Sequence, residues 1–385
     1  MANNTSKEYL KLVEIENNDT YIYEKSKNYN GIKIGINPNI KIGLEIEANN
    51  EVLKDRIFNI ETQSKIGEYK SSTDSTVPFG IEVKTPIIHD TEEDLSIFAA
   101  VLDTLKEQGY YKREEFMNVS GQINIGLDYL DSAESIIQFF ELYGNVEELL
   151  YQISNPEGEV IRQSVYANSR MKAISGIIGK QTISEDITRE EVIEMLQPDK
   201  DKSISGLRFK RDSICIRENE EETDPDCKYR LEYRIPNGSL DCTTWIDNIR
   251  LIGRMVEVSK ILGDTVIGKM EPTEKQLKLL SDKEELKNEQ LDLESKLYRL
   301  MDILFDDDET KQIYTNRFYS VQRMILQNEN DSVRKYSKVM PTESAFGILH
   351  FQRHYQTMIG KEYGSLVFTE EEFQHDEHDD IKETK

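Results

Sequence analysis

Several short segments of the chain carry carboxylates, amides or a guanidinium at alternate positions. Residues two apart on a β-strand point to the same face of the strand, and the residues between them point to the other face. Each polar pair therefore shares one side, while its Leu, Ile or Tyr neighbours occupy the opposite side. These residues are Glu45 and Glu47 in GLEIE, Glu82 in GIEVKTP, Gln122 and Asn124 in GQINIG, and Glu232 and Arg234 in LEYR.

A row of carboxylates within otherwise apolar strands is costly unless a positive charge neutralises it. Mg²⁺ prefers oxygen ligands and commonly joins protein carboxylates to nucleotide phosphates. Arg234 would lie beside such an ion, where a guanidinium can bind phosphate or acyl-phosphate oxygens in bidentate fashion. A strand with one solvent-exposed face has the same alternation of polar and apolar residues. Each segment taken alone is typical of such a strand and does not require a metal site.

A second group of polar side chains is basic and lies in GLRFKR, just before the strand that carries Glu232. Such a cluster could bind ATP phosphates, or it could form salt bridges with the acidic loop 218–226. The sequence has no Walker-type phosphate loop and no nucleophile elbow, which disfavours P-loop and α/β-hydrolase chemistry. The basic residues are Arg208, Lys210 and Arg211.

The overall charge excludes some partners. The 385 residues include 73 acidic and 48 basic side chains, which gives a net charge of −25. Nucleic-acid and anionic-membrane binding need the opposite sign, so neither partner is expected. The sequence has neither an apolar run of the ~18 residues that a membrane helix needs nor the apolar segment of a signal peptide. Its three cysteines have no Cys-x-x-Cys spacing, and we expect a reduced, cytoplasmic protein.

The elements that must position these residues follow from periodicity and turn signals. Alternating apolar residues predict strands at about 32–36 and 41–48, a pair around the turn at 77–80, a strand in MNVSGQINIGLDYL, and strands in GLRFKRDSICIR and KYRLEYRI. Helices are predicted after Thr91, after Ser132, after Thr188 and from about Thr243 to Gly263, each from a capping residue or an apolar face.

The chain from about 272 to 305 is predicted to be one long charged helix. Leucines recur there every seven residues, which is compatible with self-association through a coiled coil. An amphipathic helix packed against the main domain is the simpler alternative. The leucines are Leu279, Leu286, Leu293 and Leu300.

The polar segments, taken in order, resemble the amidoligase family, which belongs with γ-glutamylcysteine ligase and glutamine synthetase among the carboxylate-amine ligases. The matching runs are G43-L-E45-I-E47, then D74-S-T with G80-I-E82-V-K-T85-P86, then G121-Q-I-N124-I-G126, and then E232-Y-R234-I-P-N237-G238-S239-L240-D241. The resemblance spans about residues 41–262.

The resemblance implies an α+β fold with a glutamine-synthetase-like curved antiparallel sheet, helices on its outer face and a mainly helical C-terminal region. It also implies ATP and Mg²⁺ as cofactors. ATP would phosphorylate a carboxylate on a small molecule or peptide, and an amine would then attack the acyl phosphate. The expected organisation is a polar segment 1–30, a catalytic domain 31–265, a helical region 266–368 and an acidic tail 369–385.

The family motifs also imply residue roles. Glu47 and Glu82 would hold one metal ion, Glu45 and Glu232 would hold a phosphate-side metal ion, and Arg234 would contact the phosphoryl group. Asp74 matches a family aspartate that contacts metal or substrate, although it could instead cap the turn before Pro78.

Where the family has His-x-His, this chain has Gln122 and Asn124, whose amide oxygens are weaker ligands. An alternative is therefore a catalytically degenerate fold that acts as a binding or assembly protein.

Overall fold

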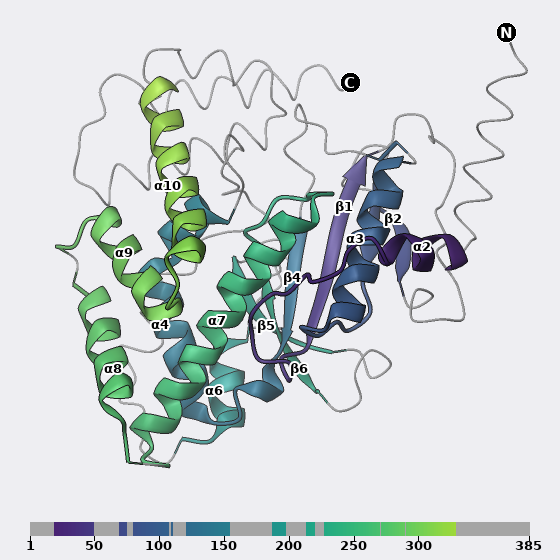
Figure 1. Ribbon diagram of the computed structural model, residues 1–385. Coiled ribbons are helices and arrows are strands. Elements are labelled where there is room, and N and C mark those ends of the chain that lie inside the picture. The colour runs from purple at the N-terminus through teal and green to yellow at the C-terminus, as the bar shows by residue number, and fades with distance from the viewer. Residues whose placement is uncertain are drawn as a thin grey trace, which may run out of the picture.

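The sheet is the element around which the rest of the molecule is arranged (Figure 1). The computed structural model describes residues 19–49, 69–74, 80–107, 109–110, 121–154, 187–197, 213–219, 227–269, 271–288 and 290–328. Within these ranges six antiparallel strands form one sheet in the order β2-β3-β1-β4-β6-β5. They are β1 (Ile42–Asn49), β2 (Lys70–Asp74), β3 (Gly80–Lys84), β4 (Gly121–Gly126), β5 (Ile214–Glu218) and β6 (Tyr229–Tyr233).

The helices lie along the sheet and beyond one end of it. The predicted α+β class, with an antiparallel sheet and a helical C-terminal region, is confirmed. The helices are α2 (Asp19–Ser26), α3 (Glu92–Glu107), α4 (Ala133–Ile153), α6 (Arg189–Leu196), α7 (Cys242–Val266), α8 (Glu274–Leu286), α9 (Leu293–Leu304) and α10 (Asp308–Asn328), with a 3-10 turn at Leu127–Tyr129.

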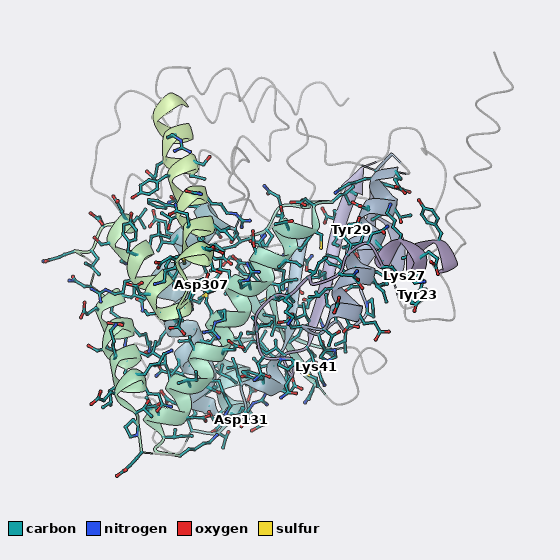
Figure 2. The ribbon with its side chains drawn as sticks, viewed as in Figure 1. Tyr23, Lys27, Tyr29, Lys41, Asp131 and Asp307 are labelled. Atoms are coloured by element: carbon teal, nitrogen blue, oxygen red, sulfur yellow. The ribbon has the colours of Figure 1, made fainter. Side chains whose placement is uncertain are left out.

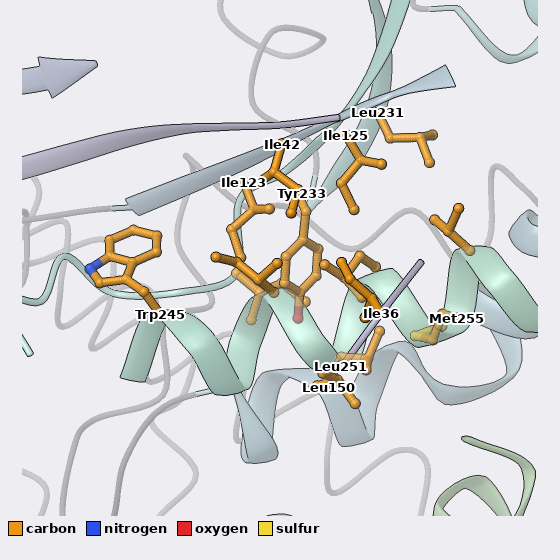
Figure 3. Close-up of a cluster of buried hydrophobic side chains, with 14 of the residues drawn as sticks. Ile36, Ile42, Ile123, Ile125, Leu150, Leu231, Tyr233, Trp245, Leu251 and Met255 are labelled. Carbon is orange, nitrogen blue, oxygen red and sulfur yellow. The ribbon is translucent and has the colours of Figure 1, made fainter. Parts of the chain in front are cut away.

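One face of the sheet is apolar and packs on helices. Ile123 and Tyr233 are opposite each other in the register of β4 and β6, and both are fully buried. Figure 3 shows them above α7, with Trp245 of α7 to their left and Leu150 of α4 lower in the view. The Tyr233 hydroxyl also lies 2.5 Å from the Ser154 hydroxyl at the end of α4. This packing leaves the alternate side chains of the same strands on the other face.

Local capping explains where several helices begin. Ser132 and Thr188 each accept a hydrogen bond from a backbone N–H three residues later, and a reciprocal side-chain contact completes a capping box. Asp241 accepts from the backbone N–H groups of Thr243 and Thr244 at the start of α7. The helix starts predicted at these three places are confirmed.

Residues 32–36 do not form the predicted strand. The backbone N–H groups of Ile34, Gly35 and Ile36 all donate to the carboxylate of Asp90, at 2.8 to 3.0 Å. Gly35 has a φ of +83°, a conformation that a strand does not contain. A side chain therefore replaces the neighbouring strand as hydrogen-bond acceptor, although Ile34 and Ile36 are buried as the alternation predicted.

The single helix predicted at 272–305 is wrong, because α8 ends at Leu286 and α9 begins at Leu293. Asp292 caps α9 by accepting from the backbone N–H of Ser295 at 2.7 Å, so a new helix starts instead of the old one continuing. Leu286 and Leu300 are fully buried, and α8 and α9 contact each other, α4 and α7. The leucines thus pack within the molecule, as the alternative interpretation expected.

A buried ion pair attaches α10 to the helices under the sheet. Arg317 donates to Asp247 of α7 at 2.5 Å and to the Ile153 carbonyl of α4 at 3.2 Å. Asp307, which is labelled in Figure 2, lies just before α10. It accepts a hydrogen bond from the Thr310 backbone N–H at 2.7 Å. No helix in the described ranges is long and apolar enough to cross a membrane.

Candidate active site

The strand register brings the predicted polar residues onto one face of the sheet. Glu47 is opposite Glu82 on β3, and Glu45 is opposite Gln122 on β4. Asn124, two residues beyond Gln122, is opposite Glu232 on β6. Partners directly opposite each other in a ladder point to the same side, as do residues two apart. The face that does not pack on α4 and α7 therefore carries Glu45, Glu47, Glu82, Gln122, Asn124 and Glu232.

The β1 and β3 part of this face is acidic. We call Glu45, Glu47 and Glu82 the acidic half. The Glu47 side chain is nearly covered, with 7 % of the residue exposed. Burial raises the pKa of Glu45, and the charges of Glu82 and Glu232 add to this effect while Lys84 opposes it. Lys84 itself lies 3.1 Å from Glu82. Added positive charge would relieve the repulsion among these carboxylates.

The β5 and β6 part of the face is basic. Arg234 donates to the Glu232 carboxylate at 2.8 Å, and the guanidiniums of Arg230 and Arg217 lie 3.6 and 3.7 Å from it. We call these three residues the arginine cluster. The thiol of Cys215, opposite Glu232 in the register, is 3.7 Å from the same carboxylate. Glu232 thus has guanidiniums as its near neighbours.

Asn124 connects the two parts of the face. Its Nδ2 group donates to Glu45 at 3.3 Å, and its Oδ1 atom accepts from Nε of Arg230 at 3.2 Å. The side-chain oxygen therefore faces the arginine cluster, and the side-chain nitrogen faces the acidic half. Gly43, opposite Asn124 in the register, leaves this position without a facing side chain.

Sequence reasoning missed two of the three arginines. Arg230 precedes Glu232 by two residues, so the alternation rule applied to Glu232 and Arg234 would also have found it. Arg217 is opposite Arg230 in the pairing of β5 with β6. Only the register of the two strands could reveal this second residue, because nothing in the local sequence of β5 specifies its partner.

The side chains of four other predicted site residues are not among those that the structure describes. Asp74 ends β2 with its backbone opposite Gly80, but its side chain is not among the described ones. The roles proposed for these residues stay predictions. Arg208, Lys210, Arg211 and the acidic tail 369–385 lie outside the described ranges altogether.

The donor chemistry of the two parts differs in its fit to a metal ion. The acidic half offers carboxylate oxygens that repel one another, which is the environment a hard divalent cation stabilises. Among the described residues, no three His, Cys, Asp or Glu side chains lie close enough together to hold a metal ion. The carboxylates of the acidic half would therefore have to rotate in order to bind one. Glu232 does not fit, because guanidiniums already surround its carboxylate.

The protein is thus an α+β protein with a two-sided sheet. One face of the sheet packs against helices, and the other face carries carboxylates beside guanidiniums. Such a face can bind a cation and an oxyanion side by side. Residues 20–256 match the family described as "Putative amidoligase enzyme", and this match covers more than half of the 385 residues. The chain belongs to this amidoligase family.

No curated protein matches the chain. Among solved structures, it is similar to a bifunctional glutathione synthetase from Pasteurella multocida, with 13 % identity and a TM-score of 0.36. That alignment covers 85 % of this chain and 54 % of the synthetase chain. The chain therefore spans about half the length of that protein.

Proposed function

We propose that the protein is an ATP- and Mg²⁺-dependent ligase that joins a carboxylate to an amine. Membership of the amidoligase family supports a carboxylate and an amine as substrates. The observation that carries the proposal is the single sheet face on which the acidic half and the arginine cluster are linked by Asn124. A cation site next to an oxyanion site is what transfer of a phosphoryl group requires.

In this proposal Glu45, Glu47 and Glu82 hold Mg²⁺. The ion, when bound, offsets the negative charge of the nucleotide phosphates. The carboxylates would have to turn toward a common point, and their mutual repulsion favours such a movement once a cation is present. Glu47 lies in register with Glu82 and on the same strand as Glu45, so the three side chains start from adjacent positions.

Arg234 is proposed to donate hydrogen bonds to the transferred phosphoryl group. Its contact with Glu232, at 2.8 Å, holds the guanidinium on the site face, which makes Glu232 a positioning residue. The substrate carboxylate oxygen would attack the γ-phosphorus of ATP, and the bond from that phosphorus to ADP would break. The amine would then attack the acyl carbon, lose a proton and expel inorganic phosphate. The products are an amide, ADP and phosphate.

The test is release of ADP by the full chain in the presence of Mg²⁺, hydroxylamine and a panel of small carboxylates and peptides that includes glutamate. Hydroxylamine traps an acyl phosphate as a hydroxamate, so both products can be measured. We expect Glu47→Gln and Glu82→Gln to lower the rate by at least ~100-fold, because each removes charge needed at the cation site. Glu194→Gln, an exposed glutamate of α6, is the matched control.

Unchanged ADP release in both site variants would refute the cation assignment. The assembly-protein alternative is addressed by a thermal melt with millimolar ATP and Mg²⁺, because a ligand that binds only the folded protein raises its melting temperature. A melting temperature that does not move would favour that alternative.

A further inference from the structure

We infer that the Glu232 end of the site binds phosphate oxygens directly on the arginine cluster, without a metal ion. The inference adds Arg217 and Arg230 as phosphate-binding residues. It rests on the proposed function only for the identity of its ligand, a nucleoside triphosphate. Divalent metal is then confined to the acidic half.

The first argument is the charge and exposure of the cluster. Three guanidiniums and one carboxylate give a formal charge of 3 − 1 = +2 for these four groups. The side chains of Arg217, Arg230 and Arg234 are 23, 25 and 13 % exposed, whereas that of Glu232 is 6 % exposed. An incoming ligand therefore meets guanidinium groups before it can reach the carboxylate. Such groups recognise phosphate oxygens in pairs.

The second argument is the orientation of the Asn124 amide, which its neighbours determine. A guanidinium can only donate hydrogen bonds and an ionised carboxylate can only accept them. The amide oxygen must therefore face Arg230, and the amide nitrogen must face Glu45. An amide NH₂ group cannot bind a metal ion. The Asn124 side chain therefore turns its nitrogen, not its oxygen, toward Glu45. A metal ion shared by Glu45 and Glu232 would have to lie on that side, and Asn124 could not be one of its ligands.

The third argument is the space around the Glu232 oxygens. Mg²⁺ lies about 2.1 Å from its ligand oxygens and keeps several waters. Nη1 of Arg234 is already 2.8 Å from Oε1 of Glu232, and Nε of Arg217 is 3.7 Å from the same atom. An ion placed there would have to displace a guanidinium of the same sign of charge. Phosphate, by contrast, would be drawn to these guanidiniums.

The experiment measures binding of tripolyphosphate to the full chain in EDTA by titration calorimetry. We expect binding without metal that weakens about 10-fold in Arg230→Gln and in Arg217→Gln, since each loses a charge-assisted hydrogen bond. Arg323→Gln, an exposed arginine of α10, should bind as the parent does. Arg230→Lys keeps the charge and loses the Nε contact to Asn124, which gives a second variant if the glutamine form does not fold.

A second measurement counts Mn²⁺ bound per chain by electron paramagnetic resonance. We expect one ion, lost in Glu47→Gln and retained in Glu232→Gln. Two bound ions, loss of the ion in Glu232→Gln, or tripolyphosphate binding that requires metal would each overturn the inference. If no hydroxamate forms but the arginine variants still weaken metal-free binding, the proposed ligase function fails while this inference stands. The reverse pattern would refute this inference alone.

Discussion

Glu148 lies in α4 on the helical side of the sheet and is 4 % exposed. Neither of its carboxylate oxygens has a hydrogen-bond partner among the described residues. Burial raises the pKa of Glu148 to about 7, and the neighbouring charge of Glu147 adds to this effect while Lys296 opposes it. Glu148 therefore keeps its proton in the folded protein up to about pH 7, whereas in the unfolded chain this carboxyl ionises near its ordinary pKa of 4.5.

The size of the effect follows from the two pKa values. The folded value of about 7 exceeds the ordinary value of 4.5 by 2.5 pH units. As the pH rises, the unfolded chain loses this proton first, so the free energy of unfolding falls between about pH 4.5 and pH 7 and then levels off. At about 1.4 kcal/mol per pH unit, the ionisable group costs about 3–4 kcal/mol above pH 7. Well below pH 4.5 the carboxyl is protonated in both the folded and the unfolded chain, so its ionisation does not affect the free energy of unfolding.

Glu148→Gln removes the titration and keeps the shape of the side chain. We expect the variant to exceed the parent in free energy of unfolding by about 3–4 kcal/mol at pH 8, and by less than about 1 kcal/mol at pH 5. Urea unfolding followed by circular dichroism at both pH values measures this difference. Glu194→Gln, at an exposed position of α6, should change neither value. An equal difference at pH 5 and pH 8 would refute the reasoning, because it would show that titration of Glu148 is not the cause.

Two further predictions concern packing. A Cβ atom at Gly121 would lie 2.2 Å from the Trp245 ring, whereas one at Gly43 would meet its nearest neighbour at 3.7 Å. Gly121→Ala should therefore cost about 1–3 kcal/mol in urea unfolding, and equal losses in Gly121→Ala and Gly43→Ala would contradict this packing. Leu286→Ala should cost about 2–5 kcal/mol without altering the elution volume in gel filtration, because Leu286 is buried within the molecule. Leu277→Ala, at an exposed position of the same helix, should cost little, and a dimer that dissociates in Leu286→Ala would oppose the assignment.

Local patterns predicted much of this protein from sequence alone. The two-residue alternation on each strand follows from the pleat of the backbone, so the common face of Glu45 and Glu47 needed no tertiary information. The same holds for the capped helix starts at Ser132 and Thr188, where the interacting atoms are three residues apart. The family motifs depended on the same local runs, and the match over residues 20–256 agrees with them.

Tertiary structure decided which residues meet across the strands. Nothing in the sequence of β5 specifies that Arg217 will be opposite Arg230. Likewise, nothing in residues 32–36 specifies that Asp90 will accept a hydrogen bond from the backbone N–H of Ile34. Such pairings depend on strand order and register, which the whole core determines. The seven-residue leucine repeat was compatible with two structures, and the cap at Asp292 with packing on α4 and α7 selected one of them.

The division of the site into an acidic half and an arginine cluster was also decided by tertiary structure. The sequence placed carboxylates on strands, but the order β3-β1-β4-β6-β5 separates three of them from Glu232 and puts Asn124 between. Charge interactions depend on distances in space, and those distances arise only when strands far apart in the chain become neighbours.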